Sequence, residues 1–265
     1  MNLDEIGKQA VEIVKATGAF IKKESASFNT SLIEYKGKND LVSYVDKTAE
    51  KQLVAGLQAL IPSSGFITEE KTINKVSEDY NWIIDPLDGT TNFTHGLPPF
   101  CISVALRLKD KLVLGIIFEI ISGECFYSWE GIDAFLNDQV IKVTDISSLD
   151  KSLIATGFPT IKYHRMDAYM EVFKHCMKNT HGLRRLGSAA IDLAYVACGR
   201  FEAFYEYGLN PWDVAAGIYI LQKAGGRVTD FSGGENYLFG EEILATNGKI
   251  HDEFLAVIKT YFNLQ

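Results

Sequence analysis

Two stretches near the start of the chain carry apolar residues at helical spacing. In residues 3–21 one face holds Leu3, Ile6, Ala10, Ile13, Val14, Thr17, Phe20 and Ile21. In residues 47–61 the corresponding face holds Leu53, Val54, Leu57, Leu60 and Ile61, and then Pro62 and Gly65 follow. This period predicts two amphipathic helices, the second of which ends before Pro62. The polar stretch 34–46 between them predicts a mobile loop or a hairpin.

Short apolar runs after the second helix predict a block rich in strands. Residues 65–70 indicate a short strand that ends in two acids, and residues 82–84 indicate a buried strand. Apolar and polar residues alternate through 100–108, and the runs 111–120 and 124–129 follow after Lys-Asp and Ser-Gly turns. Runs separated by such turns are typical of antiparallel strands joined by hairpins.

Strands and helices alternate in the rest of the chain. We expect strands at 153–158, 201–208 and 242–247, and helices at 166–178, at about 189–198, from Trp212 to Gly225-Gly226, and at the end. Alternation of this kind predicts α/β layers. The composition changes at 141–152, which we interpret as a joint. It divides the chain into a mixed α+β half, 1–145, and an α/β half, 146–265, within one globular unit.

Composition and charge narrow the class of protein. The chain has 265 residues, 47% of them hydrophobic and 23% charged, and a formal net charge of -8. These values are typical of a globular protein and disfavour nucleic acid as a partner, because no basic patch would neutralise phosphates. We expect four free cysteines, no membrane partner and a cytoplasmic location. An anionic substrate would need a divalent cation to invert the local charge.

The segment WIIDPLDGTTNF, residues 82–93, concentrates groups that bind metals and phosphate. Pro86 bends the chain after Asp85, so the turn can bring Asp85, the Leu87 carbonyl and Asp88 around one point. Mg²⁺ prefers oxygen ligands of this kind. Gly89 lets the backbone approach a ligand closely, and a helix that started there would offer free N–H groups to a phosphate oxygen.

Each acidic motif also has a purely structural interpretation. The Asp-Pro-x-Asp-Gly sequence is suited to a turn whose acids cap backbone N–H groups. Glu69 and Glu70 are suited to a solvated surface pair. Asp213, which opens a helix, is suited to an N-terminal cap. Taken one at a time, none of the three motifs decides between a site and a structural role.

Taken together, ITEE, WIIDPLDGTTNF and NPWDVAAGIYILQKAGGRVTD occur in this order over most of the chain. The set resembles the inositol monophosphatase family of Mg²⁺-dependent, lithium-sensitive phosphatases, over roughly residues 4–260. The resemblance implies an αβαβα sandwich like that of inositol monophosphatase and fructose-1,6-bisphosphatase. It also implies a homodimer, two or three Mg²⁺ ions per site, and lithium as an inhibitor.

The resemblance assigns roles residue by residue. The implied metal ligands are Glu69, Asp85, the Leu87 carbonyl, Asp88 and Asp213; Glu69, Thr90 and Asp85 are the implied catalytic residues. The implied substrate contacts are Asp88, Gly89, Thr90, Gly187, Ser188, Ala189, Glu206 and Asp213. Thr68 stands where the family has glycine, and a family serine has no counterpart near Phe158. The implied reaction is hydrolysis of myo-inositol 1-phosphate, or of a related polyol or sugar phosphate, by a metal-activated water.

Other functions stay open at this point. Fructose-1,6-bisphosphatases and 3'-phosphoadenosine-5'-phosphate phosphatases share the implied metal core, although Thr-Asn-Phe after Asp-Gly-Thr favours the inositol branch. A haloacid-dehalogenase-type phosphatase would need Asp-x-Asp-Gly-Thr, whereas the acids here are three apart. On an extended chain, residues three apart face opposite ways. A non-catalytic protein that binds a metal or a partner is the remaining alternative.

Overall fold

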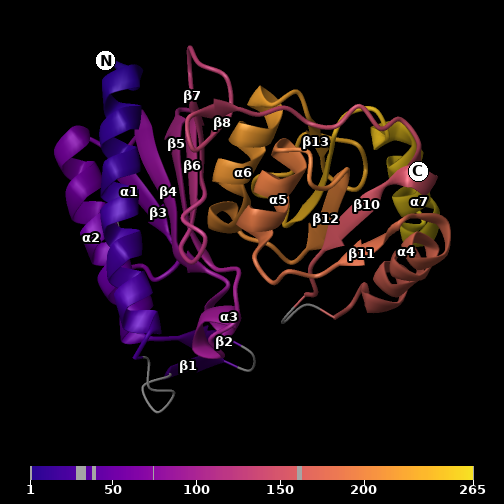
Figure 1. The fold of residues 1–265 in the computed structure, drawn as a ribbon, viewed down its shortest axis with the longest axis horizontal. Helices are drawn as coiled ribbons and strands as arrows, with labels where there is room; N and C mark the ends of the chain where they lie inside the picture. Colours follow the sequence, from indigo (N-terminus) through magenta and orange to yellow (C-terminus); the bar gives the residue numbers. More distant parts are fainter. Residues whose placement is uncertain (1, 28–33, 38–39, 74, 160–162, 265) are drawn as a thin grey trace.

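Five layers of helices and sheets stack across the molecule (Figure 1). The computed structural model describes residues 2–27, 34–37, 40–73, 75–159 and 163–264, without side chains for 34–37 and 40–42. The outer layer on one side holds α1 (Leu3–Ser25) and α2 (Tyr44–Leu60). The opposite outer layer holds α4 (Met166–Asn179) and α7 (His251–Phe262). This arrangement confirms the predicted αβαβα sandwich.

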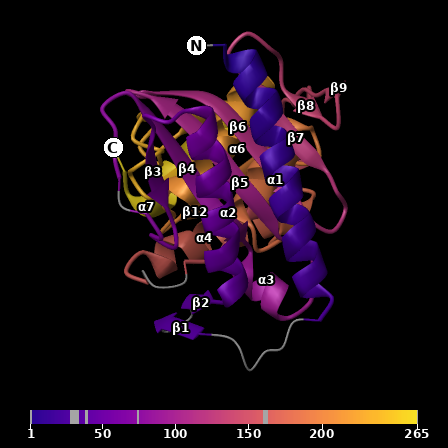
Figure 2. The ribbon, with the colours of Figure 1, turned by 90° about the vertical axis from the view of Figure 1, so that its left-hand side faces the viewer.

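The first sheet has seven strands in the order β3-β4-β5-β6-β7-β8-β9. They are β3 (Gly65–Thr68), β4 (Tyr80–Asp88), β5 (Cys101–Leu108), β6 (Lys111–Glu119), β7 (Cys125–Trp129), β8 (Phe135–Leu136) and β9 (Gln139–Val140). From β4 to β9 every neighbouring pair is antiparallel, as the hairpin turns predict, whereas β3 joins β4 in parallel. Figure 2 shows α1 and α2 lying across one face of this sheet.

The second sheet has five strands in the order β11-β10-β12-β14-β13. They are β10 (Leu153–Thr156), β11 (Gly182–Arg184), β12 (Ala203–Tyr207), β13 (Arg227–Thr229) and β14 (Glu242–Thr246). β10 pairs in parallel with β11 and β12, and β14 pairs antiparallel with β12 and β13. The sequence pattern missed β8, β9, β11 and β13, because two or three residues are too few to show a period.

Helices α5 (Ala189–Ala197) and α6 (Pro211–Lys223) form the middle layer between the two sheets (Figure 1). Small residues allow this close packing. A Cβ on Gly115 of β6 would lie 2.5 Å from the carbonyl oxygen of Ala216, and a Cβ on Gly217 would lie 2.5 Å from the Cβ of Leu193. Both helices are therefore buried against other layers and show little of the one-sided pattern of a surface helix.

The N-terminal part of α2 departs from the sequence prediction in a way that bears on the site. β1 (Glu34–Gly37) and β2 (Asp40–Val42) pair antiparallel, as a hairpin would; residues 38 and 39 lie outside the described residues. The helix then begins at Tyr44, three residues earlier than predicted. Ser43 and Asp46 form a capping box in which the Asp46 carboxylate accepts from the Ser43 backbone N–H at 2.9 Å.

The strand β4 also departs from prediction. We expected the strand to end before Asp85, but β4 extends through Asp88. Asp85 pairs with Ser103 and Asp88 with Cys101, so β4 has one extra residue between these pairs, a β-bulge. Pro86 has no N–H to donate and is tolerated at such a bulge. In the part of the chain that the structure describes, no helix is long and apolar enough to cross a membrane.

Candidate active site

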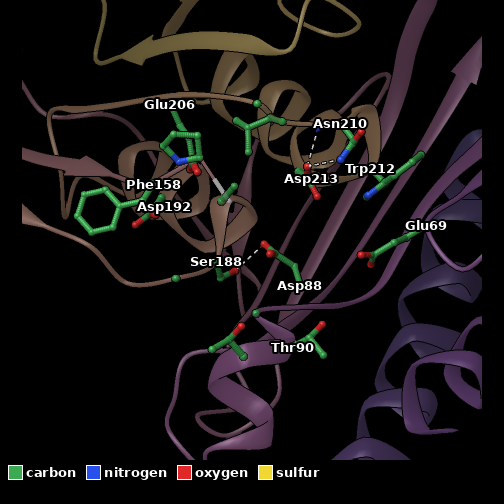
Figure 3. Close-up of a pocket in the computed structure, with 18 of the residues that line it drawn as sticks. Glu69, Asp88, Thr90, Phe158, Ser188, Asp192, Glu206, Asn210, Trp212 and Asp213 are labelled. Atoms are coloured by element: carbon green, nitrogen blue, oxygen red, sulfur yellow. Dashed lines mark hydrogen bonds between the residues drawn. The ribbon is translucent and has the colours of Figure 1, made fainter. Parts of the chain in front are cut away.

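A cavity of about 640 Å³ opens where the ends of both sheets meet the middle helices. Figure 3 shows Glu69, Trp212 and Asp213 on one side of it, Phe158, Asp192 and Glu206 on the other, and Asp88 and Ser188 between them. The predicted site residues that line the cavity are Glu69, Asp88, Gly89, Thr90, Gly187, Ser188, Ala189, Glu206 and Asp213. The structure therefore brings together residues that lie far apart in the sequence.

Asp85 and Leu87 are the two predicted site residues that do not line the cavity wall. Both are buried, with exposed fractions of 2% and 0%. The Asp85 carboxylate accepts the Leu87 N–H at 2.9 Å, which shapes the bulge. The Leu87 carbonyl accepts from the Thr90 hydroxyl at 3.0 Å. Here the predicted turn chemistry is present beside the predicted ligand groups, so the two interpretations of this motif are compatible.

Asp88 is tied to the start of α5 on the far side of the cavity. One carboxylate oxygen accepts from the Ser188 hydroxyl at 2.7 Å and from the Ala190 N–H at 2.8 Å. Ser188 is also the N-cap of α5, where its hydroxyl oxygen accepts from the Ile191 N–H at 3.3 Å. The bond between Asp88 and α5 joins a strand of the first sheet to the middle layer and sets the direction of the carboxylate.

Glu50, which the sequence analysis did not single out, organises the loop that carries Glu69. This buried residue of α2 accepts four hydrogen bonds, of 2.7 to 2.9 Å, from the Thr68 hydroxyl, the Glu70 N–H, and the N–H and hydroxyl of Thr72. Thr68 therefore makes a hydrogen bond to Glu50 that a glycine at this position could not make. The signal in the sequence was only an acid on a helix.

Asp46 is a second site residue that the sequence analysis missed. Its carboxylate is 1% exposed and lies 3.3 Å from the Thr90 hydroxyl oxygen, which donates to it or to the Leu87 carbonyl. Its other oxygen accepts from the Ser43 hydroxyl at 2.6 Å. Ser-x-x-Asp at a helix start could have been recognised as a capping box. The contact with Thr90, 44 residues away, depends on how α2 packs against β4.

Asp213 caps its helix and also lies where the predicted metal site would be. It forms a capping box with Asn210, whose backbone N–H donates to the Asp213 carboxylate at 2.6 Å. The same residue lines the cavity. On the inner side of α6, the Trp212 carbonyl accepts from the Ser103 hydroxyl at 3.1 Å, which attaches the helix start to β5. The cap fixes the direction in which Asp213 faces the cavity.

Glu206 reaches the cavity because the residue opposite it is a glycine. A Cβ on Gly157 would lie 1.9 Å from one Glu206 carboxylate oxygen and 2.1 Å from its carboxyl carbon. Phe158 follows and has an exposed fraction of 40%, with the Arg185 guanidinium 5.5 Å from its ring centre. The side of the cavity where the family serine lacks a counterpart therefore presents an aromatic face.

The cavity is strongly acidic. Burial raises the pKa of Asp88 to about 6, of Asp213 to about 7 and of Glu206 to about 8. Burial also raises the pKa of Asp85 well above its usual range, and Glu69, Asp88 and Asp213 add to this by repulsion. Neighbouring carboxylates that repel one another in a water-poor site favour the uptake of protons or of a cation.

The donor chemistry of these acids fits Mg²⁺. The described residues that line the cavity include carboxylates but no histidine or cysteine, and Mg²⁺ prefers oxygen. Across the residues that the structure describes, no group of three or more His, Cys, Asp or Glu side chains is already arranged to hold a metal ion. The carboxylates therefore match Mg²⁺ in their chemistry, although the described side chains do not form a ready metal cluster.

Comparison with known proteins places the chain in a family. The model of the inositol monophosphatase family matches residues 2–261. The chain is 37% identical over 248 residues to Nus factor SuhB of Escherichia coli K12, covering 93% of each, and 35% identical over 250 residues to inositol-1-monophosphatase of Mesorhizobium japonicum, covering 94% of each. The chain therefore belongs to the inositol monophosphatase family, and the predicted resemblance is confirmed.

Solved structures agree with this assignment. The extragenic suppressor protein SuhB of Bartonella henselae superposes with a TM-score of 0.89 at 35% identity, covering 96% of this chain and 98% of that one. The IMPase of Thermotoga maritima superposes with a TM-score of 0.86 at 34% identity, covering 96% of each chain. The layered architecture described above is thus the architecture of these relatives.

Proposed function

We propose that the protein is a Mg²⁺-dependent phosphatase that hydrolyses a polyol or sugar monophosphate, with myo-inositol 1-phosphate as the first candidate. The observation that carries the proposal is the convergence of Glu69, Asp88 and Asp213 at one cavity beside the Gly89-Thr90 turn. All three acids repel the buried Asp85, and Asp88 also repels Asp213, so the cluster is costly unless it binds something cationic. A relative named inositol-1-monophosphatase supports the same reaction.

When bound, Mg²⁺ would supply positive charge that offsets the phosphate and makes water a better nucleophile. The carboxylates of Glu69, Asp85, Asp88 and Asp213, with the Leu87 carbonyl, would hold two or three such ions. Asp88 would keep its direction through the hydrogen bonds from Ser188 and Ala190. Glu69 would keep its place through the loop that Glu50 organises.

Thr90 and Asp46 are placed to move one proton. Thr90 lines the cavity, and its hydroxyl can donate to the Asp46 carboxylate, 3.3 Å away, so its oxygen would then be available to accept a proton. The attacking water can pass a proton to Thr90 Oγ1 while Thr90 passes its proton to Asp46. The water oxygen bonds to phosphorus, and the alcohol oxygen leaves with the electron pair of the P–O bond that breaks. This alkoxide takes up a proton from solvent to become the free alcohol, and Asp46 later returns its proton to solvent. Thr90 is thus the proposed catalytic residue that touches the water.

The direct test is phosphate release from myo-inositol 1-phosphate, measured with Mg²⁺ and with EDTA. Release that EDTA abolishes supports the proposal, and lithium should inhibit it. Asp213→Asn should lower turnover by about 100-fold or more, because it removes a charge from the donor set. Asp167→Asn is the matched control, since it removes an exposed first-turn acid from α4, outside the cavity. Absence of release from every phosphate monoester would refute the proposal.

Two related substrates remain within the proposal as alternatives. Fructose 1,6-bisphosphate and 3'-phosphoadenosine 5'-phosphate are run beside the inositol phosphate, and the highest kcat/KM decides between the three. Membership of the inositol monophosphatase family disfavours the haloacid-dehalogenase route. Trapping with a phosphate analogue should accordingly yield no aspartyl adduct at Asp85 or Asp88.

Relatives named Nus factors support a second candidate, in which this chain also acts as a Nus factor. Introducing Asp213→Asn into a host that lacks its own copy separates the candidates. A cellular role that survives the loss of hydrolysis belongs to the second candidate, whereas one that is lost with hydrolysis belongs to the first.

The assembly and location of the protein are part of the same proposal. We propose a homodimer that works in the cytoplasm. Its four cysteines are unpaired, which suits a reducing compartment. Light scattering coupled to size-exclusion chromatography tests the dimer: a mass near twice 29.5 kDa supports it, and a mass near 29.5 kDa refutes it.

A further inference from the structure

Asp192 is an acid in the cavity wall that neither the motifs nor the resemblance assign. It lies in the first turn of α5, is 1% exposed and lines the cavity. Its Oδ1 atom has no hydrogen-bond partner among the residues that the structure describes. A buried carboxylate oxygen without a donor is costly, so a ligand that donates a hydrogen bond to it would recover that cost.

The surroundings of Asp192 indicate what kind of ligand group fits. In the view of Figure 3, Asp192, Phe158 and Glu206 lie on the side of the cavity away from Glu69, and Asp192 is close enough to Glu206 to be repelled by it. Two carboxylates therefore face this end, and Arg185 is the cation beside them, over the Phe158 ring. Acceptors next to an exposed aromatic face are the groups that bind the hydroxyls and the C–H face of a ring polyol.

Charge at this end disfavours a second phosphate. Burial raises the pKa of Asp192 well above its usual range; repulsion from Glu206 and Asp88 acts in the same direction, and the Arg185 guanidinium opposes it. An anionic group would add to this repulsion, whereas a neutral hydroxyl would relieve the unpaired oxygen by donating to it. The subsite is therefore suited to the uncharged part of a phosphate monoester.

We propose that Asp192 is a specificity-determining residue, which accepts a hydrogen bond from a hydroxyl of a ring polyol phosphate whose ring lies on Phe158. This inference rests on the proposed function and deepens it, since it assigns the alcohol end of the same cavity. Glu206, for whose carboxylate Gly157 leaves room, accepts a hydrogen bond from a neighbouring hydroxyl of the same ring. The phosphate lies at the opposite end, beside Asp88 and Thr90.

The test compares two substrates, myo-inositol 1-phosphate and p-nitrophenyl phosphate, which has no hydroxyl to donate. For Asp192→Ala we expect kcat/KM for the inositol phosphate to fall about 30-fold, mainly through KM. We expect the ratio of the two kcat/KM values to change at least tenfold. Asp192→Asn keeps an acceptor oxygen, but one that is uncharged and therefore weaker. Its kcat/KM for the inositol phosphate should lie between the values of the wild type and the alanine variant.

Glu119→Gln is the matched control, because Glu119 is also a buried acid with one unpartnered oxygen but does not line the cavity. It should leave the ratio of the two substrates unaltered. Melting temperatures of all variants identify any loss of fold. The ratio, rather than the activity, is the readout, so a partly destabilised variant remains informative.

Four outcomes overturn the inference and are distinguishable from one another. Equal losses on both substrates in Asp192→Ala would show a structural role for Asp192, and no loss on either would show no role. A wild type that hydrolyses p-nitrophenyl phosphate but no polyol phosphate would keep the phosphatase and remove the polyol subsite. A wild type that hydrolyses no phosphate monoester would overturn the proposed function itself, and this inference with it.

Discussion

The buried His251 at the start of α7 should make the protein sensitive to acid. Its side chain is completely buried, and its ring nitrogens lie 3.1 Å from the Thr229 hydroxyl and 3.0 Å from the Thr246 hydroxyl. Thr246 already accepts a hydrogen bond from the Gly248 N–H, so its own proton is available to the imidazole. The neutral ring, with its proton on Nε2, therefore satisfies both threonines, whereas the charged ring does not.

The size of the effect follows from the pKa of His251. Burial lowers it from the usual 6.5 to about 4; Arg227 acts in the same direction and Asp252 opposes it. An unfolded chain takes up the proton as the pH falls through 6.5, but the native protein takes it up only near 4. Stability from this group is therefore complete above pH 6.5 and is lost on acidification. Linkage gives a loss of about 2 kcal/mol by pH 5.

Urea unfolding near pH 7.5 and near pH 5 measures the effect. Between these two conditions the free energy of unfolding of the wild type should fall by about 2 kcal/mol more than that of His251→Gln. Other acids titrate in the same range, but they do so in the wild type and in the variant alike. Their contributions therefore cancel when the two changes in the free energy of unfolding are subtracted. The exposed His181→Gln is the control and should follow the wild type. Equal pH dependence in the wild type and His251→Gln would refute the reasoning.

Three further substitutions test the packing around the cavity. Gly157→Ala should displace the Glu206 carboxylate by more than 1 Å; we expect kcat/KM to fall about 10- to 100-fold while the melting temperature holds. Glu50→Ala removes four hydrogen bonds, two of them from Thr72, and should cost about 3 kcal/mol in urea unfolding together with most of the activity. In Gly115→Ala the added methyl group would press against the backbone of α6, and the free energy of unfolding should fall by about 1–3 kcal/mol. An unchanged free energy of unfolding would contradict this packing argument.

The long periodic elements and the acidic motifs were predictable because their signals are local. The apolar face of α1 repeats over six turns, and Asp85, Asp88 and Asp213 stand in motifs that also resemble a known family. Placing all three around one point required the resemblance, since no pattern in the sequence says which strand ends are neighbours. The bulge that carries β4 on to Asp88 depends on pairing with β5 and was missed for the same reason.

The residues that support the site could not be predicted, because their roles depend on contacts between distant segments. Asp46 and Glu50 are ordinary acids on a helix until α2 packs beside Thr90 and the loop of Glu69. Asp192 is one polar position on an otherwise apolar helix. What distinguishes it is the missing hydrogen-bond partner, which is visible only when the helix lies in the cavity wall.

The origin of the cavity wall in two sheets has a consequence for how such proteins diversify. On the roles proposed above, the groups that handle the phosphate all precede residue 95 except Asp213, while Phe158, Asp192 and Glu206 follow residue 156. Substitutions at Phe158, Asp192 or Glu206 can therefore alter which alcohol is accepted and leave the hydrolytic groups in place. A lineage with this fold can change its metabolic substrate by drift in one part of its gene, without passing through an inactive ancestor.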